Sequence, residues 1–232
     1  MTGTRDGAIG RAEKYFDDLA PAIPRVWQNE IDDLKTDLRA WLIDVSERST
    51  EWTPIHFELS FGLQAADNRD RSSSLEPVTL EGAGIVRGSI DLVERHNTTG
   101  VLRITDHKTG SFPQKPPIYT GGGSILQPVL YSMAVAKLLD APVQTGRLYY
   151  CTRKGDYKDV QIRFTREAQD NLETVLHTID EAVATGFLPA APKPDACEYC
   201  DYRVVCGPYE VERTSRKRKD RLQPLVLLRE LP

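Results

Sequence analysis

Several stretches of the chain carry apolar residues at the spacing of one helix face, most clearly residues 25–46, where they recur at threes and fours. The pattern predicts helices over residues 11–19, 25–46, 125–139 and 166–185. Ser124 and Thr165 stand where N-caps are expected for the last two helices, and Pro128 falls in a first turn, where proline is tolerated. Gly186 is expected to end the final helix.

Between these helices, apolar and polar residues alternate, which is the two-residue repeat of a strand with one buried face. Alternation and short apolar runs predict strands over residues 55–61, 78–80, 84–93, 101–105, 146–152 and 160–164. The turn HNTTG at residues 96–100 predicts an antiparallel hairpin, and the polar, aperiodic residues 64–77 predict a surface loop. This order of elements favours an α/β or α+β fold with one central sheet.

Composition and charge describe an ordinary soluble globular protein. The 232 residues carry a formal net charge of -4, and no apolar run is long enough for a membrane span or a signal peptide, so we expect a cytoplasmic protein. Six basic residues and one acidic residue lie within residues 213–221, which leaves an acidic body that argues against binding through bulk positive charge. The basic run is either a phosphate-binding segment or a solvated tail.

Two carboxylates and a lysine form the main candidate for chemistry. Asp106 and Lys108 are two residues apart in one predicted strand, so their side chains share a face. If the two strands pair through the HNTTG turn, Asp91 lies beside Asp106. Two adjacent carboxylates repel each other unless a cation lies between them, which predicts a Mg²⁺ or Mn²⁺ site suited to phosphodiester hydrolysis.

Five motifs in order resemble one known family, the PD-(D/E)XK nuclease domain of RecB-like and AddB-like recombination proteins. They are FELSFG (57–62), GSIDLVE (88–94), ITDHKTG (104–110), Gln127 with Tyr131, and CEYCDYRVVC (197–206). The resemblance spans about residues 27–207. It implies an α/β restriction-endonuclease-like core, in which a central mixed sheet is flanked by helices and a cysteine-cluster segment follows. The expected organisation is a helical segment (1–50), a nuclease core (51–190), a cysteine-cluster segment (191–212) and a basic tail (213–232).

The resemblance also implies roles for single residues. Asp91 and Asp106 match the metal-binding acids and Lys108 the catalytic lysine, while Gln127 and Tyr131 match a Q-x-x-x-Y motif on the DNA-binding side. The family would use only the backbone of the residue between Asp106 and Lys108, and an acid in the FELSFG strand is given no catalytic role. The implied activity is that of a Mg²⁺- or Mn²⁺-dependent DNA exonuclease in recombination and repair.

No Walker motif is present in the sequence, so any helicase or recombination subunit that works with this nuclease would be on another chain or on a missing portion. Two non-enzymatic alternatives remain. One is a nuclease-like module that binds DNA or a partner without cleaving it. The other is an interaction protein with a structural zinc site, in which the acidic residues and the lysine are coincidental.

Three clustered cysteines predict a second metal site. Cys197, Cys200 and Cys206 have the spacing C-x₂-C-x₅-C, and thiolates suit zinc and iron–sulfur clusters alike. The resemblance favours a [4Fe–4S] cluster, whose fourth ligand in the family lies upstream of the core, where this chain has no cysteine before Cys151. Three explanations stay open: Cys151 substitutes, another residue type completes the site, or the chain is shorter than the family norm. An early-helix histidine of the family is also absent here.

Overall fold

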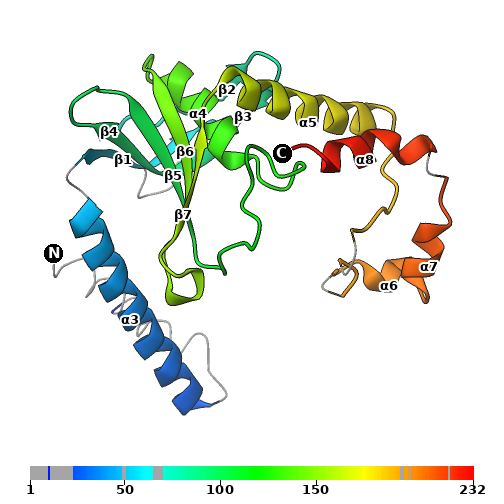
Figure 1. Ribbon diagram of the computed structural model, residues 1–232, viewed down its shortest axis with the longest axis horizontal. Helices are drawn as coiled ribbons and strands as arrows, with labels where there is room; N and C mark the ends of the chain where they lie inside the picture. The colour runs from blue at the N-terminus through cyan, green and yellow to red at the C-terminus, as the bar shows by residue number, and fades with distance from the viewer. Residues whose placement is uncertain are drawn as a thin grey trace.

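The alternating segments form a five-stranded mixed sheet in the order β1-β4-β5-β6-β7 (Figure 1). In this computed structural model the described residues are 10, 23–48, 51–64, 70–193, 196–198, 200–218 and 220–232. The sheet strands are β1 (Trp52–Phe61), β4 (Gly88–His96), β5 (Leu102–Lys108), β6 (Val143–Tyr150) and β7 (Asp159–Arg163). β5 and β6 run parallel and the other neighbouring pairs run antiparallel. This confirms the predicted mixed central sheet, and the predicted helix over residues 11–19 lies outside the described residues.

The described residues form helices of very different lengths, and one of them explains the parallel pair of the sheet. They are α3 (Pro24–Arg48), α4 (Gln127–Leu138), α5 (Arg166–Ala184), α6 (Arg203–Cys206), α7 (Glu210–Ser215) and α8 (Gln223–Arg229), with 3₁₀ turns η1 (Arg153–Gly155) and η2 (Asp220–Leu222). Two parallel strands need a crossover connection. Helix α4 provides it, because it lies between β5 and β6 in the sequence and packs on both strands. α3 lies at the other side of the sheet from α5 and α8 in Figure 1.

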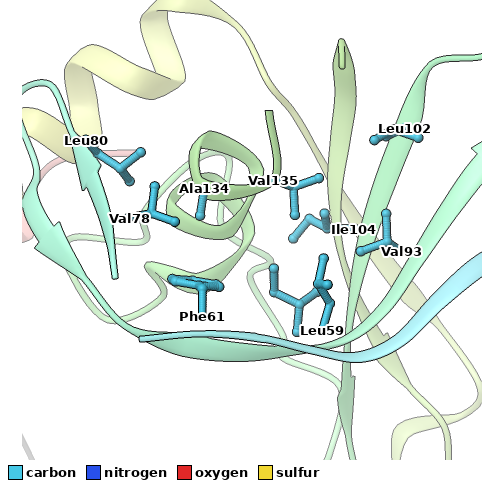
Figure 2. Packing of buried hydrophobic residues seen from close by; sticks show 10 residues of the cluster. Leu59, Phe61, Val78, Leu80, Val93, Leu102, Ile104, Ala134 and Val135 are labelled. Atoms are coloured by element: carbon cyan, nitrogen blue, oxygen red, sulfur yellow. The ribbon is translucent and has the colours of Figure 1, made fainter. Parts of the chain in front are cut away.

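The main apolar core lies between the sheet and α4 (Figure 2). Strands β1 and β5 contribute alternate residues to it, and β4 contributes two residues three positions apart. Helix α4 contributes small apolar residues, and the short hairpin of β2 (Val78–Leu80) and β3 (Gly84–Val86) closes one side. Its buried members are Leu59, Phe61, Val78, Leu80, Ile90, Val93, Leu102, Ile104, Ala134 and Val135. A second cluster continues it under α5, around Leu148, Ile162 and Leu172.

The opposite face of the sheet carries a group of buried charges. Arg103 donates from Nε and Nη2 to the two Glu94 oxygens at 2.9 and 2.8 Å. Arg147 reaches the same carboxylate at 3.2 Å and donates from Nε to Thr105 Oγ1 at 2.9 Å. The Arg103 guanidinium also stacks over Trp52 at 4.3 Å. The residues of this ionic network, Glu94, Arg103, Thr105 and Arg147, are all buried.

Several sequence predictions of local structure are confirmed and others are corrected. Thr165 caps α5, because its Oγ1 accepts from the Ala168 N–H at 3.3 Å, and Gly186 follows the helix with a φ of +66°. Ser124 does not cap α4: the helix begins later, and the Ser124 hydroxyl donates to the Gly121 carbonyl at 2.6 Å. The predicted strand over residues 84–93 is two strands, because β3 pairs with β2 while β4 belongs to the main sheet.

The C-terminal residues also form structure that the hydrophobic pattern did not predict. Helix α8 packs against α5, and Leu228 is buried there. The Pro232 carbonyl accepts from the Thr120 and Gly121 N–H groups at 2.8 and 3.2 Å, which ties the loop before α4 to the end of the chain. Among the described residues, no helix is both long and apolar enough to cross a membrane.

Candidate active site

Asp91 and Asp106 lie side by side where the ladder between β4 and β5 ends. The last paired residues are Leu92 and Thr105, so the next position on each strand is an aspartate. The register of the hairpin between β4 and β5 therefore places the two aspartates next to each other, as the sequence predicted. The two carboxylates are close enough for the charge of Asp91 to raise the pKa of Asp106.

An irregularity in β1 faces Asp91. Glu58 has a φ of +53°, which is left-handed backbone that residues other than glycine rarely adopt. The pairing between β1 and β4 skips Glu58 and Asp91, between the regular pairs formed by Phe57 and Leu59. The register is the same on both sides of Glu58, so this is a local distortion without an extra residue, and the register shift of the strand pair lies between Pro54 and His56. Left-handed backbone at residues other than glycine is enriched at active sites. Glu58 itself accepts a hydrogen bond from Ser89 Oγ at 3.2 Å.

Asp91 is held by His107, the residue between Asp106 and Lys108 in β5. The His107 N–H donates to Asp91 Oδ2 at 2.7 Å, and His107 Nδ1 lies 3.5 Å from the same oxygen. Burial would raise the pKa of Asp91, but the hydrogen bonds and charge of His107 outweigh it, and the pKa lies below its ordinary value. Asp91 is therefore a stable carboxylate.

Asp106 has the opposite electrostatic setting. Burial raises its pKa above the ordinary value, although Lys108 acts in the other direction. Lys108 Nζ lies 2.6 Å from the buried Asp106 Oδ2 as an ion pair, and this contact opposes the rise in the pKa of Asp106. This oxygen is therefore placed to interact with a positive charge, which coordination of a cation also requires.

Helix α4 brings two further predicted residues to the same place. Lys108 Nζ is 3.4 Å from Gln127 Oε1, in the first turn of α4. Tyr131, one turn later, packs on Gly88, where an added Cβ would lie only 3.0 Å from the ring. The pKa of Tyr131 is raised by burial and by the charges of Asp106 and Asp91. The glycine of the GSID motif thus gives the tyrosine room to approach the carboxylates.

The donor set fits a hard divalent cation. Mg²⁺ in proteins is usually bound by one or two carboxylates, with water and substrate phosphate completing the shell. Asp91 and Asp106 supply two neighbouring carboxylates, and one Asp106 oxygen faces the Lys108 ammonium. The described residues contain no group of three or more His, Cys, Asp or Glu side chains arranged to hold a metal, so any cation here would depend on backbone, water and substrate oxygens as well.

Cys151 lies in a different part of the sequence from the three C-terminal cysteines. Cys151 follows β6, where its N–H donates to the Lys108 carbonyl at 3.0 Å and its thiol lies 3.6 Å from the same oxygen. Burial and the charges of Glu210 and the other two cysteines raise the pKa of Cys197, so these three C-terminal thiols are neighbours. Within the described residues they do not form a metal-binding group with each other or with Cys151, and the arrangement does not fit the expected iron–sulfur cluster.

Several side chains of the predicted basic tail make contacts within the chain. Lys217 Nζ donates to the Ala190 carbonyl at 2.7 Å, and Arg218 pairs with Asp220 at 2.6 Å. Arg221 stacks over the Phe187 ring at 4.4 Å. The contacts of Lys217 and Arg221 link the segment to the chain that leaves α5, so part of its charge is used in local structure.

The contact between α3 and this site is not predicted by the sequence pattern. The rings of Trp41 and His107 meet edge to face with centroids 5.9 Å apart. The alternation along β5 predicts only one part of this contact, namely that the His107 side chain faces away from those of Asp106 and Lys108. Nothing in the local pattern shows that α3 supplies the ring it meets.

Comparison with known proteins agrees with the geometry. Residues 7–207 match the family described as the PD-(D/E)XK nuclease superfamily. No curated protein matches the chain. Among solved structures, the crystal structure of SSO0001 is similar, with 16% sequence identity and a TM-score of 0.34 over 84% of this chain and 80% of that chain. Because the family match covers most of the sequence and includes every residue of the candidate site, the chain belongs to the PD-(D/E)XK nuclease superfamily.

Proposed function

We propose that the protein is a metal-dependent deoxyribonuclease that hydrolyses phosphodiester bonds. One observation carries the proposal: Asp91, Asp106 and Lys108 converge at the ends of β4 and β5, next to Gln127 and Tyr131 of α4. Two carboxylates beside a lysine are a combination that suits attack of water on a phosphate.

Each residue has a defined task in this proposal. Asp91 and Asp106 would hold Mg²⁺ or Mn²⁺, which when bound acidifies water and neutralises charge on the phosphate. Lys108, fixed by Asp106 and Gln127, positions the attacking water and stabilises negative charge that develops on the phosphate oxygens. Gln127 and Tyr131 lie on one face of α4 and guide the DNA strand past the carboxylates.

The finer assignment is exonuclease action at DNA ends in recombination and repair, as in RecB-like and AddB-like proteins. The order of the five motifs supports it. Any helicase that works with this nuclease would be on a separate chain or on a portion beyond this sequence, because the sequence has no Walker motif.

The test is cleavage of end-labelled linear DNA and closed circular DNA with Mg²⁺ or Mn²⁺, with and without a chelator. Lys108→Ala is expected to lower cleavage by about a hundredfold to a thousandfold while circular dichroism shows an intact fold. Lys137→Ala, at the other end of α4, is the matched control and is expected to cleave like the wild type. Cleavage of linear DNA alone supports an exonuclease.

Two results would contradict the proposal. Wild-type-like cleavage by Lys108→Ala removes the assignment of the site. Binding of DNA by the wild type without cleavage in any divalent metal favours the alternative, a nuclease-like module that binds DNA or a partner.

The iron–sulfur cluster stays a prediction of the resemblance, and the described arrangement of the cysteines does not support it. Metal analysis of the purified protein decides the matter. Iron with sulfide indicates a cluster, zinc indicates a structural site, and either should make Cys200→Ser less stable to heat. Neither metal, together with unchanged thermal stability in Cys200→Ser, would exclude both.

A further inference from the structure

His107 lies between Asp106 and Lys108 in the sequence, and its ring packs away from those two side chains although its Nδ1 stays 3.5 Å from Asp91 Oδ2. Alternation along β5 turns its side chain to the opposite face of the sheet. There its ring meets Trp41 of α3 and Tyr149 of β6, with centroids 5.9 Å away in each case. The His107 N–H donates to Asp91 Oδ2 at 2.7 Å. One residue therefore connects α3 and β6 to a carboxylate of the candidate metal site.

The two rings that enclose His107 are themselves fixed. Tyr149 is fully buried, it pairs with His107 in the ladder between β5 and β6, and its hydroxyl donates to Asp44 of α3. Arg153, after β6, holds Asp33 and Asp37 of α3 at 2.5 and 3.0 Å. α3 is thus held to the sheet on both sides of Trp41, and a fixed Trp41 restricts the motion of the His107 ring.

We propose that His107 is a positioning residue, whose ring, packed between Trp41 and Tyr149, fixes the backbone N–H that orients Asp91 toward the divalent cation. The inference rests on the proposed function, because it assigns Asp91 to that cation. Hydrogen-bond partners of metal ligands set ligand orientation, and their loss typically weakens metal binding by about 10–100-fold. On this account α3 contributes to metal affinity without contacting the metal.

The test is Mn²⁺ binding to the full chain without DNA, measured by calorimetry or electron paramagnetic resonance. His107→Ala is expected to weaken binding by about 10–100-fold. Cleavage should show the matching split, with a higher KM for Mn²⁺ and a kcat at saturating Mn²⁺ close to that of the wild type. Trp41→Leu is expected to weaken Mn²⁺ binding in the same direction, because it removes one of the two enclosing rings.

Two further variants distinguish the effect of the His107 ring from the effect of its nitrogen atom. His107→Phe keeps a ring between Trp41 and Tyr149 and is expected to restore binding, whereas His107→Asn keeps a polar atom and is expected to bind as weakly as His107→Ala. This pair decides the matter even if His107→Ala does not fold. His177→Ala, which changes an exposed histidine of α5, is the matched control and should bind like the wild type.

Unchanged Mn²⁺ affinity in His107→Ala would overturn the inference, and so would restoration by asparagine but not by phenylalanine. The outcome for the proposed function is read separately, from the wild type. A wild type that neither binds Mn²⁺ nor cleaves DNA contradicts both proposals. A wild type that does both, with an indistinguishable His107→Ala, contradicts only the role of His107.

Discussion

The two faces of strand β5 are both buried, but one packs against apolar residues and the other against charged residues. Leu102 and Ile104 face α4 and pack in the apolar core, and the same face then carries Asp106 and Lys108. Arg103 and Thr105 face the other way into the ionic network around Glu94. Apolar packing tolerates small losses of volume, whereas a buried charge depends on its partners, so the two faces should respond very differently to substitution.

The largest expected effect on stability is at the centre of the ionic network. Glu94→Ala leaves Arg103 and Arg147 buried without the carboxylate they share, and should lower the free energy of unfolding by about 3–5 kcal/mol. Urea denaturation measures it. Arg95→Ala, at the exposed neighbouring position, is the control and should change stability by less than about 0.5 kcal/mol. A loss in Glu94→Ala no larger than that control would mean that the network contributes nothing.

The ionic network should also make the stability of the protein depend on pH. Burial raises the pKa of Glu94, but hydrogen bonds and charge from Arg103 and Arg147 outweigh it, so the folded pKa lies below the ordinary value. The stabilisation is then fully present above the unfolded-state pKa of about 4.3 and is lost as pH falls through the folded pKa. The stability difference between wild type and Glu94→Gln should shrink below about pH 4. A difference that stays constant from about pH 7 to about pH 3 would contradict this.

A pair of neighbouring substitutions to valine compares the two faces directly. Thr105→Val removes the hydroxyl that donates to Glu94 and accepts from Arg147, both at 2.9 Å, and should cost about 1–3 kcal/mol. The shape of the side chain is nearly kept, so the loss reports hydrogen bonding. Denaturation of the single variant measures it, and a neutral result would show that water or rearrangement replaces the hydroxyl.

The smallest effect is expected one residue earlier, on the apolar face. Ile104→Val removes one buried methylene from the core and should cost about 0.5–1.5 kcal/mol. Thermal or urea denaturation beside Thr105→Val gives the comparison within one strand. A larger loss for Ile104→Val than for Thr105→Val would reverse the ranking of the two faces.

Much of the site could be predicted from the sequence, because it depends on short-range geometry. The i, i+2 spacing of Asp106 and Lys108 and the i, i+4 spacing of Gln127 and Tyr131 determine which side chains share a face. The HNTTG turn sets the register that brings Asp91 next to Asp106. These relations extend over at most a hairpin, so local pattern is enough.

Other features were decided only by tertiary structure, because they join segments far apart in the chain. Arg147 reaches Glu94 across 53 positions, and nothing near either residue indicates the other. The left-handed backbone of Glu58 lies opposite Asp91 on the neighbouring strand, at a position where β1 and β4 do not pair. The docking of α3, which brings Trp41 to His107, likewise depends on packing that no periodicity describes. The sequence by itself determined which residues form the candidate site, and the tertiary structure decided what supports it.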